Sequence, residues 1–268
     1  MGMICNNCNY KHLRNVMNIK NLPISNFYNS SKIKFNIKNY NIFSCRNCSL
    51  IQVKNNFSLD DLIPKNNKIK QNEPEEHLDK LVSKIIQKKF LNKKSNILCL
   101  SYKDSSLAER FKKKGYLNVE ILNYKRFFSS QKVFFENIEN FNDKKFFKKL
   151  SMKKKYDLII GRHIIEHFFY PKRFIENLKI ILNPKNGYIY FEIPDSLKSL
   201  KNFDYNMLWE QHKMYFTKSS LIDLMNTTKF RKIFCDDYKY KYENCILFLG
   251  RLSKKTNKNI RNFKKKEY

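Results

Sequence analysis

Two Cys-x-x-Cys pairs stand near the beginning of the chain, Cys5 with Cys8 and Cys45 with Cys48. Each spacing places two thiolates on one tight turn, and two such turns brought together form the tetrahedral sulfur site that zinc prefers. A redox dithiol is the alternative, but it is expected where a strand meets a helix in a βαβ unit, and neither pair stands there. The pattern predicts a closed structural zinc site, because four sulfur ligands leave no open coordination position.

A second group of reactive side chains lies in Arg162–His167 (RHIIEH), where two histidines and a glutamate occur together. The spacing His163-x-x-Glu166-His167 also matches the inverted zinc-protease pattern, which needs a stable helix that presents both histidines. However, Pro171 follows closely and the segment comes directly after an apolar run, so a stable helix is not expected here. This context disfavours a catalytic metal. Two interpretations of these histidines and the glutamate remain: they stabilise a loop by hydrogen bonds, or they are catalytic groups.

A third group begins at Trp209-Glu210-Gln211-His212 and continues to Tyr215 and Phe216. A histidine in such an aromatic segment is often a packed core residue. Two histidines from separate strand ends can also converge on one cleft and divide the acid and base roles. His167 and His212 are therefore candidate partners.

The elements that must position these groups alternate between strand and helix patterns from Ser95 onward. Such alternation predicts an α/β fold with a mostly parallel sheet and helices on both sides. The last two strands, near Lys232–Cys235 and Cys245–Leu249, are compatible with an antiparallel hairpin. The expected strands before them are Asn96–Leu100, Asn118–Leu122, Lys132–Asn137, Tyr156–Gly161 and Tyr188–Ile193. Ligands of open α/β sheets bind at the carboxyl ends of the strands. Three polar segments fall there: Ser101–Ser106, Arg162–His167 and the stretch from Pro194 to Phe216.

The predicted domain organisation has four parts. Residues 1–60 form a small β-rich module around the metal, and residues 72–92 form a helix that links it to the rest. Residues 95–252 form the Rossmann-like α/β domain, and residues 253–268 form a basic tail.

The composition bounds the function. The net charge of +30 comes from 54 basic and 24 acidic residues, but the lysines are spread along the chain without interleaved aromatic residues. This pattern is typical of solvated lysine faces, and it disfavours dedicated nucleic-acid binding. No apolar run approaches bilayer length and the first residues lack a secretory apolar core. The three further cysteines lie in apolar strand-like runs, as buried thiols of a reducing compartment do. We expect a cytoplasmic protein.

Taken together, the motifs resemble one family. CNNC, MNIKNLPISNFY, SCRNCSLIQV, RHIIEH, ILNPKNGYIYFEIPD and WEQHKMYFT occur in the order found in zinc-containing sugar C-methyltransferases. That family joins an N-terminal four-cysteine zinc domain to a class I S-adenosylmethionine-dependent methyltransferase fold. The resemblance covers roughly residues 3–250 and implies both zinc and S-adenosylmethionine as cofactors.

The resemblance also implies a reaction, C-methylation beside a ketone on a nucleotide-linked sugar or related small molecule. A base must take a proton from the α-carbon, and hydrogen-bond donors must stabilise the enolate. The family's base corresponds to His212, and a second active-site histidine corresponds to His167. Glu210 and Tyr215 are expected to orient His212. The family has a glutamate directly before the base, where this chain has Gln211.

The sequence departs from the family most strongly in the residues that bind the cofactor. Class I methyltransferases follow the first strand with an acidic, glycine-rich loop, and glycine lets the backbone approach the ligand closely. Here the three glycine positions carry side chains. An asparagine stands where an acid usually holds the ribose hydroxyls. The residues that the resemblance assigns to cofactor binding are Leu100, Ser101, Lys103, Asp104, Ser105, Asn123, Arg162 and His163.

Three functions stay open from the sequence. The first is an S-adenosylmethionine-dependent methyltransferase with a divergent cofactor loop. The second is a degenerate methyltransferase fold that acts as a binding or scaffold protein. The third is a basic zinc protein that binds nucleic acid, which the scattered lysines and the six family motifs disfavour.

Overall fold

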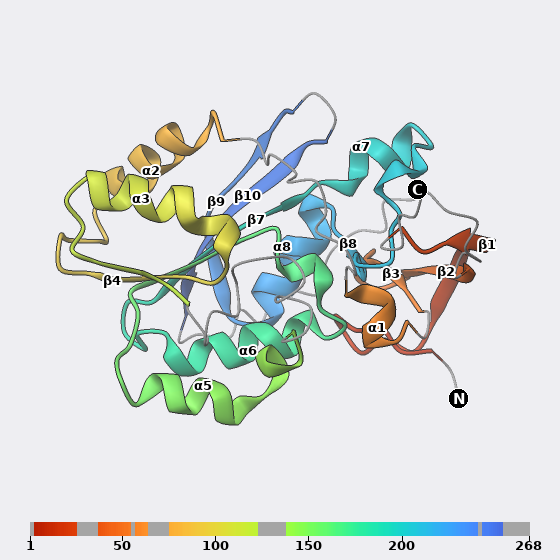
Figure 1. The fold of residues 1–268 in the computed structure, drawn as a ribbon, viewed down its shortest axis with the longest axis horizontal. Helices are drawn as coiled ribbons and strands as arrows, with labels where there is room; N and C mark the ends of the chain where they lie inside the picture. Colours follow the sequence, from red (N-terminus) through yellow and green to blue (C-terminus); the bar gives the residue numbers. More distant parts are fainter. Residues whose placement is uncertain are drawn as a thin grey trace.

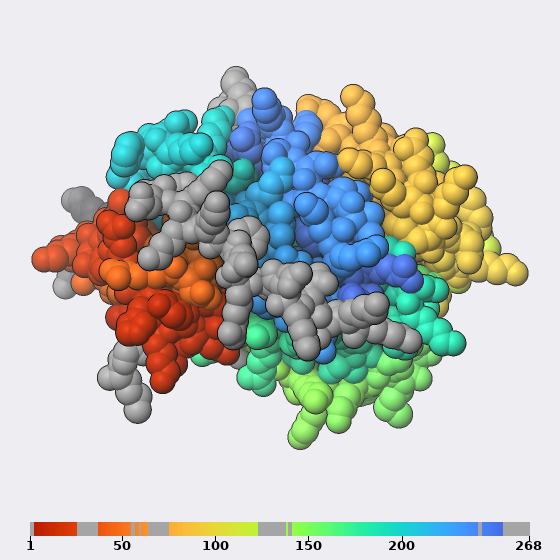
Figure 2. Space-filling model, turned by 180° about the vertical axis from the view of Figure 1, so that it is seen from behind, coloured from red at the N-terminus to blue at the C-terminus, as the bar shows by residue number. Residues whose placement is uncertain are grey.

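The computed structural model describes residues 3–25, 37–54, 57–63, 75–122, 138–240 and 243–253. These residues form a six-stranded sheet and a smaller four-stranded sheet. Helices cover both faces of the larger sheet (Figure 1). Figure 2 shows the strands of the N-terminal module at one end of the molecule and helices α2 and α3 at the other.

The larger sheet has the strand order β5-β4-β6-β7-β10-β9. The strands are β4 (Asn96–Cys99), β5 (Asn118–Ile121), β6 (Leu158–Arg162), β7 (Tyr188–Pro194), β9 (Phe230–Tyr238) and β10 (Cys245–Leu252). β5, β4, β6 and β7 are parallel, and β10 runs antiparallel to both β7 and β9. The predicted Rossmann-like class I sheet, with its antiparallel terminal hairpin, is thereby confirmed.

Alternation along the strands builds a core on each face of this sheet. In β6, Ile159 packs into one apolar cluster, whereas Leu158 and Ile160 pack into the other. The first cluster contains residues of α5, α6 and α8, and the second contains residues of α2 and α3. The helices are α1 (Leu59–Leu62), α2 (Leu78–Gln87), α3 (Ser105–Lys113), α5 (Lys144–Ser151), α6 (Pro171–Ile181), α7 (Ser196–Lys201) and α8 (Lys218–Thr227). The helix expected to link the two parts, α2, therefore packs over the main sheet.

Local signals explain where several helices begin and end. Pro171 begins α6, where its missing N–H and fixed φ suit the first turn. Thr217 caps α8 with its side chain. Gly115 follows α3 with a φ of 80°, which glycine adopts readily. Asp143 caps α5, because its carboxylate accepts the backbone N–H of Lys145.

The smaller sheet has the order β1-β2-β3-β8. Its strands are β1 (Leu13–Pro23), β2 (Ile37–Cys45), β3 (Ile51–Val53) and β8 (Met214–Tyr215). Three of them belong to the N-terminal module, but β8 comes from the segment that follows α7. It pairs with β3 through Ile51 opposite Tyr215 and Gln52 opposite Met214. The module and the larger domain thus share one sheet.

Some predicted features lie outside the described residues, namely the strand at Lys132–Asn137, the helix start at residues 72–74, Asn123 and most of the basic tail. Four short 3-10 turns complete the described chain: η1 (Tyr102–Asp104), η2 (Ile138–Asn142), η3 (Ile165–His167) and η4 (Tyr205–Met207). In the part of the chain that the structure describes, each helix is too short or too polar to cross a bilayer.

Candidate functional site

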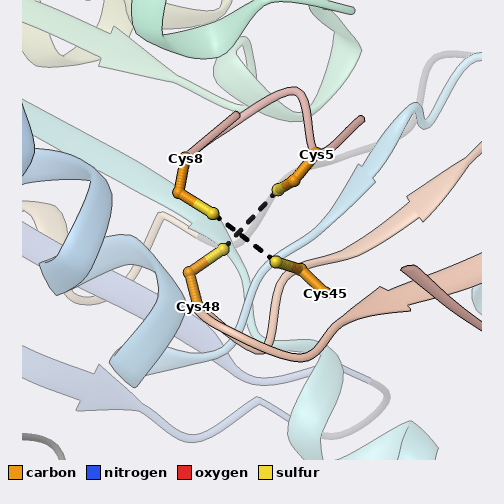
Figure 3. A group of neighbouring side chains, drawn as sticks. All are labelled: Cys5, Cys8, Cys45 and Cys48. Atoms are coloured by element: carbon orange, nitrogen blue, oxygen red, sulfur yellow. Dashed lines mark hydrogen bonds between the residues drawn. The ribbon is translucent and has the colours of Figure 1, made fainter. Parts of the chain in front are cut away.

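The four cysteines of the module converge on one point (Figure 3). The sulfurs of Cys5 and Cys48 lie 3.7 Å apart, and those of Cys8 and Cys45 lie 3.5 Å apart. Tetrahedral coordination with metal–sulfur bonds of about 2.3 Å places the sulfurs about 3.8 Å apart. The observed spacing is therefore that of a four-sulfur metal cage.

The two cysteine turns have the same local structure. In each, the backbone N–H two residues after the first cysteine points to that cysteine's sulfur at 3.4 Å. The residue after the second cysteine has a left-handed φ in both, 61° at Asn9 and 57° at Ser49. Asparagine tolerates this conformation better than most residues. Amide donors directed at sulfur stabilise thiolates, which are the form that binds metal.

The two candidate histidines lie next to each other. His167 is in η3, after β6, and His212 precedes β8. Their ring centroids are 5.1 Å apart. The Trp209 ring meets the His212 ring edge-on at 5.0 Å, and the Tyr215 ring lies 6.2 Å from it. Residues from two separate strand ends thus form one imidazole pair, as the sequence predicts.

Hydrogen bonding and burial set the protonation of this pair. Nδ1 of His167 lies 3.0 Å from the carbonyl oxygen of Gln211. Because a carbonyl only accepts, this nitrogen carries the proton. Burial lowers the pKa of His212 well below its usual value, and the charges of His167 and Lys103 lower it further. His212 is therefore neutral at pH 7 and able to accept a proton.

Glu210 does not take the orienting role that was expected of it. Its carboxylate accepts hydrogen bonds from the backbone N–H of Ser25 at 3.1 Å and from the Ser25 hydroxyl at 2.9 Å. The Tyr40 hydroxyl also donates to it, at 3.4 Å. In the turn before β8 the Glu210 side chain is directed to the module, whereas His212 meets His167. The structure makes Glu210 an anchor of the N-terminal module rather than a partner of His212.

The RHIIEH segment does not form the helix that a zinc protease requires. His163 adopts a φ of 48° directly after β6, and its Nε2 lies 3.4 Å from a carboxylate oxygen of Glu192. His167 instead contacts the Gln211 carbonyl. The two histidines therefore face different partners.

The loop after β4 is held by one buried carboxylate. Asp104 is fully buried and accepts the backbone N–H groups of Ser101 and Arg162, both at 2.9 Å. It thus joins the ends of β4 and β6. Burial raises the pKa of Asp104 to about 7, although the charge of Arg162 opposes this shift. In the segment from Leu100 to Ser105 every φ is negative. Side chains at the positions where the family has glycine therefore cause no backbone strain.

Arg162 extends this arrangement into a buried polar network. Its guanidinium donates to the Lys103 carbonyl at 3.1 Å and to the Glu192 carboxylate at 3.0 Å. The His77 ring and the Tyr190 hydroxyl each lie 3.1 Å from the other Glu192 oxygen. Burial acts to raise the pKa of Glu192, but hydrogen bonds from His163 and His77 and the Arg162 charge hold it well below its usual range. The buried Arg162 guanidinium thus makes its hydrogen bonds within the protein, to Lys103 and Glu192.

Sequence reasoning missed Glu192 and Lys213. Glu192 is an acid within the apolar run YIYFEI, and an acid inside a buried strand signals a buried partner. Lys213 is fully buried, with its ammonium group 2.6 Å from the Glu210 carbonyl and 4.2 Å from the centre of the Phe57 ring. Burial lowers the pKa of Lys213 to about 7. Nothing in the surrounding sequence distinguishes this lysine from the many exposed ones.

The sequence profile of a methyltransferase domain matches residues 75–233. The chain belongs to this methyltransferase domain family. The matched region runs from just before α2 into β9 and contains the loop after β4, His167 and His212. Together with the class I fold, this makes the protein an S-adenosylmethionine-dependent methyltransferase in general terms.

Solved methyltransferases have a similar fold. One is the 1,6-didemethyltoxoflavin-N1-methyltransferase of Burkholderia thailandensis, with 11% identity over 66% of this chain and 79% of that chain and a TM-score of 0.44. Another is the magnesium protoporphyrin IX methyltransferase of Synechocystis PCC 6803, with 11% identity over 66% of this chain and 82% of that chain and a TM-score of 0.40. A search of curated proteins finds no match. The family assignment rests on the matched profile.

Among the described residues, the candidate cofactor site is the edge where β4 and β6 end. This edge is the point at which the strand order reverses, where open α/β sheets bind ligands. Tyr102 and Lys103 are partly exposed there and Ser105 is exposed. Leu100, Ser101, Asp104, Arg162 and His163 are buried. The Ser105 hydroxyl and the partly exposed residues Tyr102 and Lys103 are therefore accessible to a ligand, while the buried side chains hold the loop in shape.

Proposed function

We propose that this methyltransferase transfers a methyl group to a carbon atom beside a ketone, on a nucleotide-linked sugar or a related small molecule. The observation that carries the proposal is the His167–His212 pair, with ring centroids 5.1 Å apart and His212 held neutral. A neutral imidazole is the group that proton removal from a carbon acid at pH 7 requires. The motifs around both histidines support the sugar substrate.

The proposed reaction has a simple proton balance. His212 takes the proton from the α-carbon, and the electron pair of that bond moves into the enolate. Protonated His167, whose Nδ1–H is donated to the Gln211 carbonyl, stabilises the enolate oxygen through its Nε2–H. Bound S-adenosylmethionine supplies an electrophilic methyl group on a sulfonium. The α-carbon forms the new bond, the carbon–sulfur bond breaks, and His212 is left protonated until it exchanges with solvent.

Tyr215 has a supporting place in this proposal. Its ring lies beside His212, and burial raises the pKa of its hydroxyl, which therefore stays protonated. The contact between the Tyr215 ring and the His212 ring limits the motion of the imidazole. The partly exposed loop residues Tyr102 to Ser105 would hold the cofactor at the strand ends near the pair.

We also propose that the four cysteines hold one structural zinc ion. The sulfur spacing and the paired turns support zinc over two free dithiols. Elemental analysis of protein purified without chelator should give about one zinc per chain. Zinc absent from the folded protein, with all four thiols titrating freely, contradicts this proposal.

The test of the reaction uses keto-deoxysugar nucleotides in deuterated water. With S-adenosylhomocysteine bound, the wild type should exchange the α-hydrogen for deuterium, and with S-adenosylmethionine it should add a methyl to that carbon. His212→Gln should lower both rates by about 10²- to 10⁴-fold and keep cofactor affinity. His12→Gln, at an exposed histidine of the module, is the control. Unchanged exchange in His212→Gln rejects His212 as the base.

A further inference from the structure

The segment that carries His212 is held between the module and the larger domain. On the module side, β8 pairs with β3, and the backbone N–H of Val53 donates to the Lys213 carbonyl at 3.0 Å. On the other side, the Lys213 N–H donates to the Glu166 carbonyl at 2.9 Å. His212 stands directly before Lys213. Its position therefore depends on where β3 lies.

β3 alone is a weak support. It has three residues and β8 has two, and pairs this short are marginal without further contacts. Its central residue, Gln52, pairs with Met214 of β8 and is fully buried. The Oε1 atom of Gln52 accepts the backbone N–H of Asn6 at 3.0 Å. Asn6 lies within the first cysteine turn, so one side chain connects the metal cage to the strand that pairs with β8.

A buried hydrogen bond of this kind constrains position. The Asn6 N–H lies between two metal-ligating cysteines, so a bound ion fixes where it points. If Oε1 moves away, the half-buried Asn6 N–H and the buried Gln52 oxygen both lose this partner, which costs about 1–3 kcal/mol for the buried group. Gln52, the β3 residue opposite β8, thus attaches β3 to the first cysteine turn by a hydrogen bond.

We propose that Gln52 is a positioning residue for His212: it ties the first cysteine turn to β3, and through β8 it keeps the His212 ring in contact with His167. This inference rests on the proposed role of His212. It assigns the zinc module a part in the active site beyond folding of its own segment. The module sets the position of the base.

The chain contains a built-in probe for this claim. Trp209 is its single tryptophan, and its ring contacts the His212 ring at 5.0 Å. Protonation of an imidazole in contact with an indole quenches indole fluorescence. The pH midpoint of Trp209 quenching therefore reports the surroundings of His212. The charged and titratable groups that face His212 are His167, Lys103, His163, Lys213, Glu166 and Tyr215.

The first variant is Gln52→Leu. In the described part of the chain, Nε2 of Gln52 has no hydrogen-bond partner, so leucine removes one unsatisfied buried group and the fold should persist. With the tie lost, His212 should become more solvated. The quenching midpoint should then rise by about half a pH unit or more, toward the ordinary histidine value of about 6.5. Asn6→Pro removes the same hydrogen bond from the other partner and should give the same shift.

Three controls decide the outcome. Gln87→Leu, at an exposed glutamine of α2, should leave the midpoint unchanged. His212→Gln should abolish the quenching step. Thermal unfolding and zinc content are measured for each variant. A midpoint equal to wild type in both tie variants, even with a lower melting temperature, means that Gln52 only stabilises the fold and overturns the inference. Because no substrate is used, failure here is distinct from failure of the proposed reaction.

Discussion

At the scale of single residues, the Asp104 side chain fixes the shape of the loop after β4. In the family pattern, glycines allow this loop its shape through their backbone freedom. The two oxygens of Asp104 accept backbone N–H groups from the ends of two neighbouring strands. The loop after β4 therefore keeps its shape with ordinary φ values. The cost is a fully buried carboxyl group, which desolvation disfavours in its charged form.

Asp104→Asn tests this account through the pH dependence of stability. The pKa of Asp104 is about 7 in the folded protein, above the usual value near 3.9, so folding favours the protonated form. Its contribution to the free energy of unfolding is fully present below about pH 4 and is lost as pH rises through about 7. One pKa unit corresponds to about 1.4 kcal/mol.

The measurement is urea unfolding of wild type and Asp104→Asn at several pH values. The free energy of unfolding of the wild type, relative to the variant, should fall by a few kcal/mol between pH 4 and pH 7. Exposed Glu109→Gln, in α3, serves as a control for general charge effects. A wild-type-minus-variant difference that stays constant across this range contradicts the assignment.

The sequence predicts some residues of the site and not others, for physical reasons. His167 and His212 could be paired because both follow strand-like segments, and the sheet brings strand ends together. Glu210 was assigned to the wrong partner, because the direction of a side chain in a turn depends on tertiary contacts, here with Ser25. Lys213 could not be recognised as buried in a chain with 54 basic residues.

At the scale of elements, the loop between β4 and α3 decides how well the cofactor binds. Lys103 occupies a glycine position of the family pattern, and its charge acts on His212. A sulfonium bound beside this loop meets a like charge, which disfavours binding at short range. We therefore propose that the loop holds S-adenosylmethionine less tightly than a glycine loop would.

Lys103→Gly should strengthen cofactor binding, since it removes both the side chain and its charge. Lys103→Met removes the charge alone. Both variants should improve affinity for S-adenosylmethionine more than for uncharged S-adenosylhomocysteine, by about threefold to tenfold, equivalent to about 0.6–1.4 kcal/mol. Titration calorimetry with both ligands measures the ratio. Equal changes for the two ligands show that charge plays no part.

Element prediction succeeded where periodicity was long. α6 has an apolar stripe over three turns and a proline start, and β6 and β7 are continuous apolar runs. β8 gave no signal, because two residues carry no period, and its partner Ile51–Val53 lies far away in the sequence. The strand that links the two parts of the protein was therefore the one that sequence could not show.

At the scale of the whole molecule, the protein is a methyltransferase domain in which the segment with the proposed base, His212, is shared between two sheets. The larger sheet presents His167 and the loop after β4, and the smaller sheet holds the segment with His212. The N-terminal module is joined to this segment by strand pairing and by the Glu210–Ser25 bonds. The loop after β4, the His167–His212 pair and the four-cysteine cluster thus form one connected unit.

The most direct test of this account is calorimetric titration of the zinc-loaded, folded protein with S-adenosylmethionine and S-adenosylhomocysteine. We predict saturable one-site binding of both ligands with dissociation constants below about 1 mM, the range in which enzymes bind their substrates. His212→Gln should retain this binding. An absence of heat with either ligand at millimolar concentration, in protein whose fold and metal content are intact, contradicts the central claim.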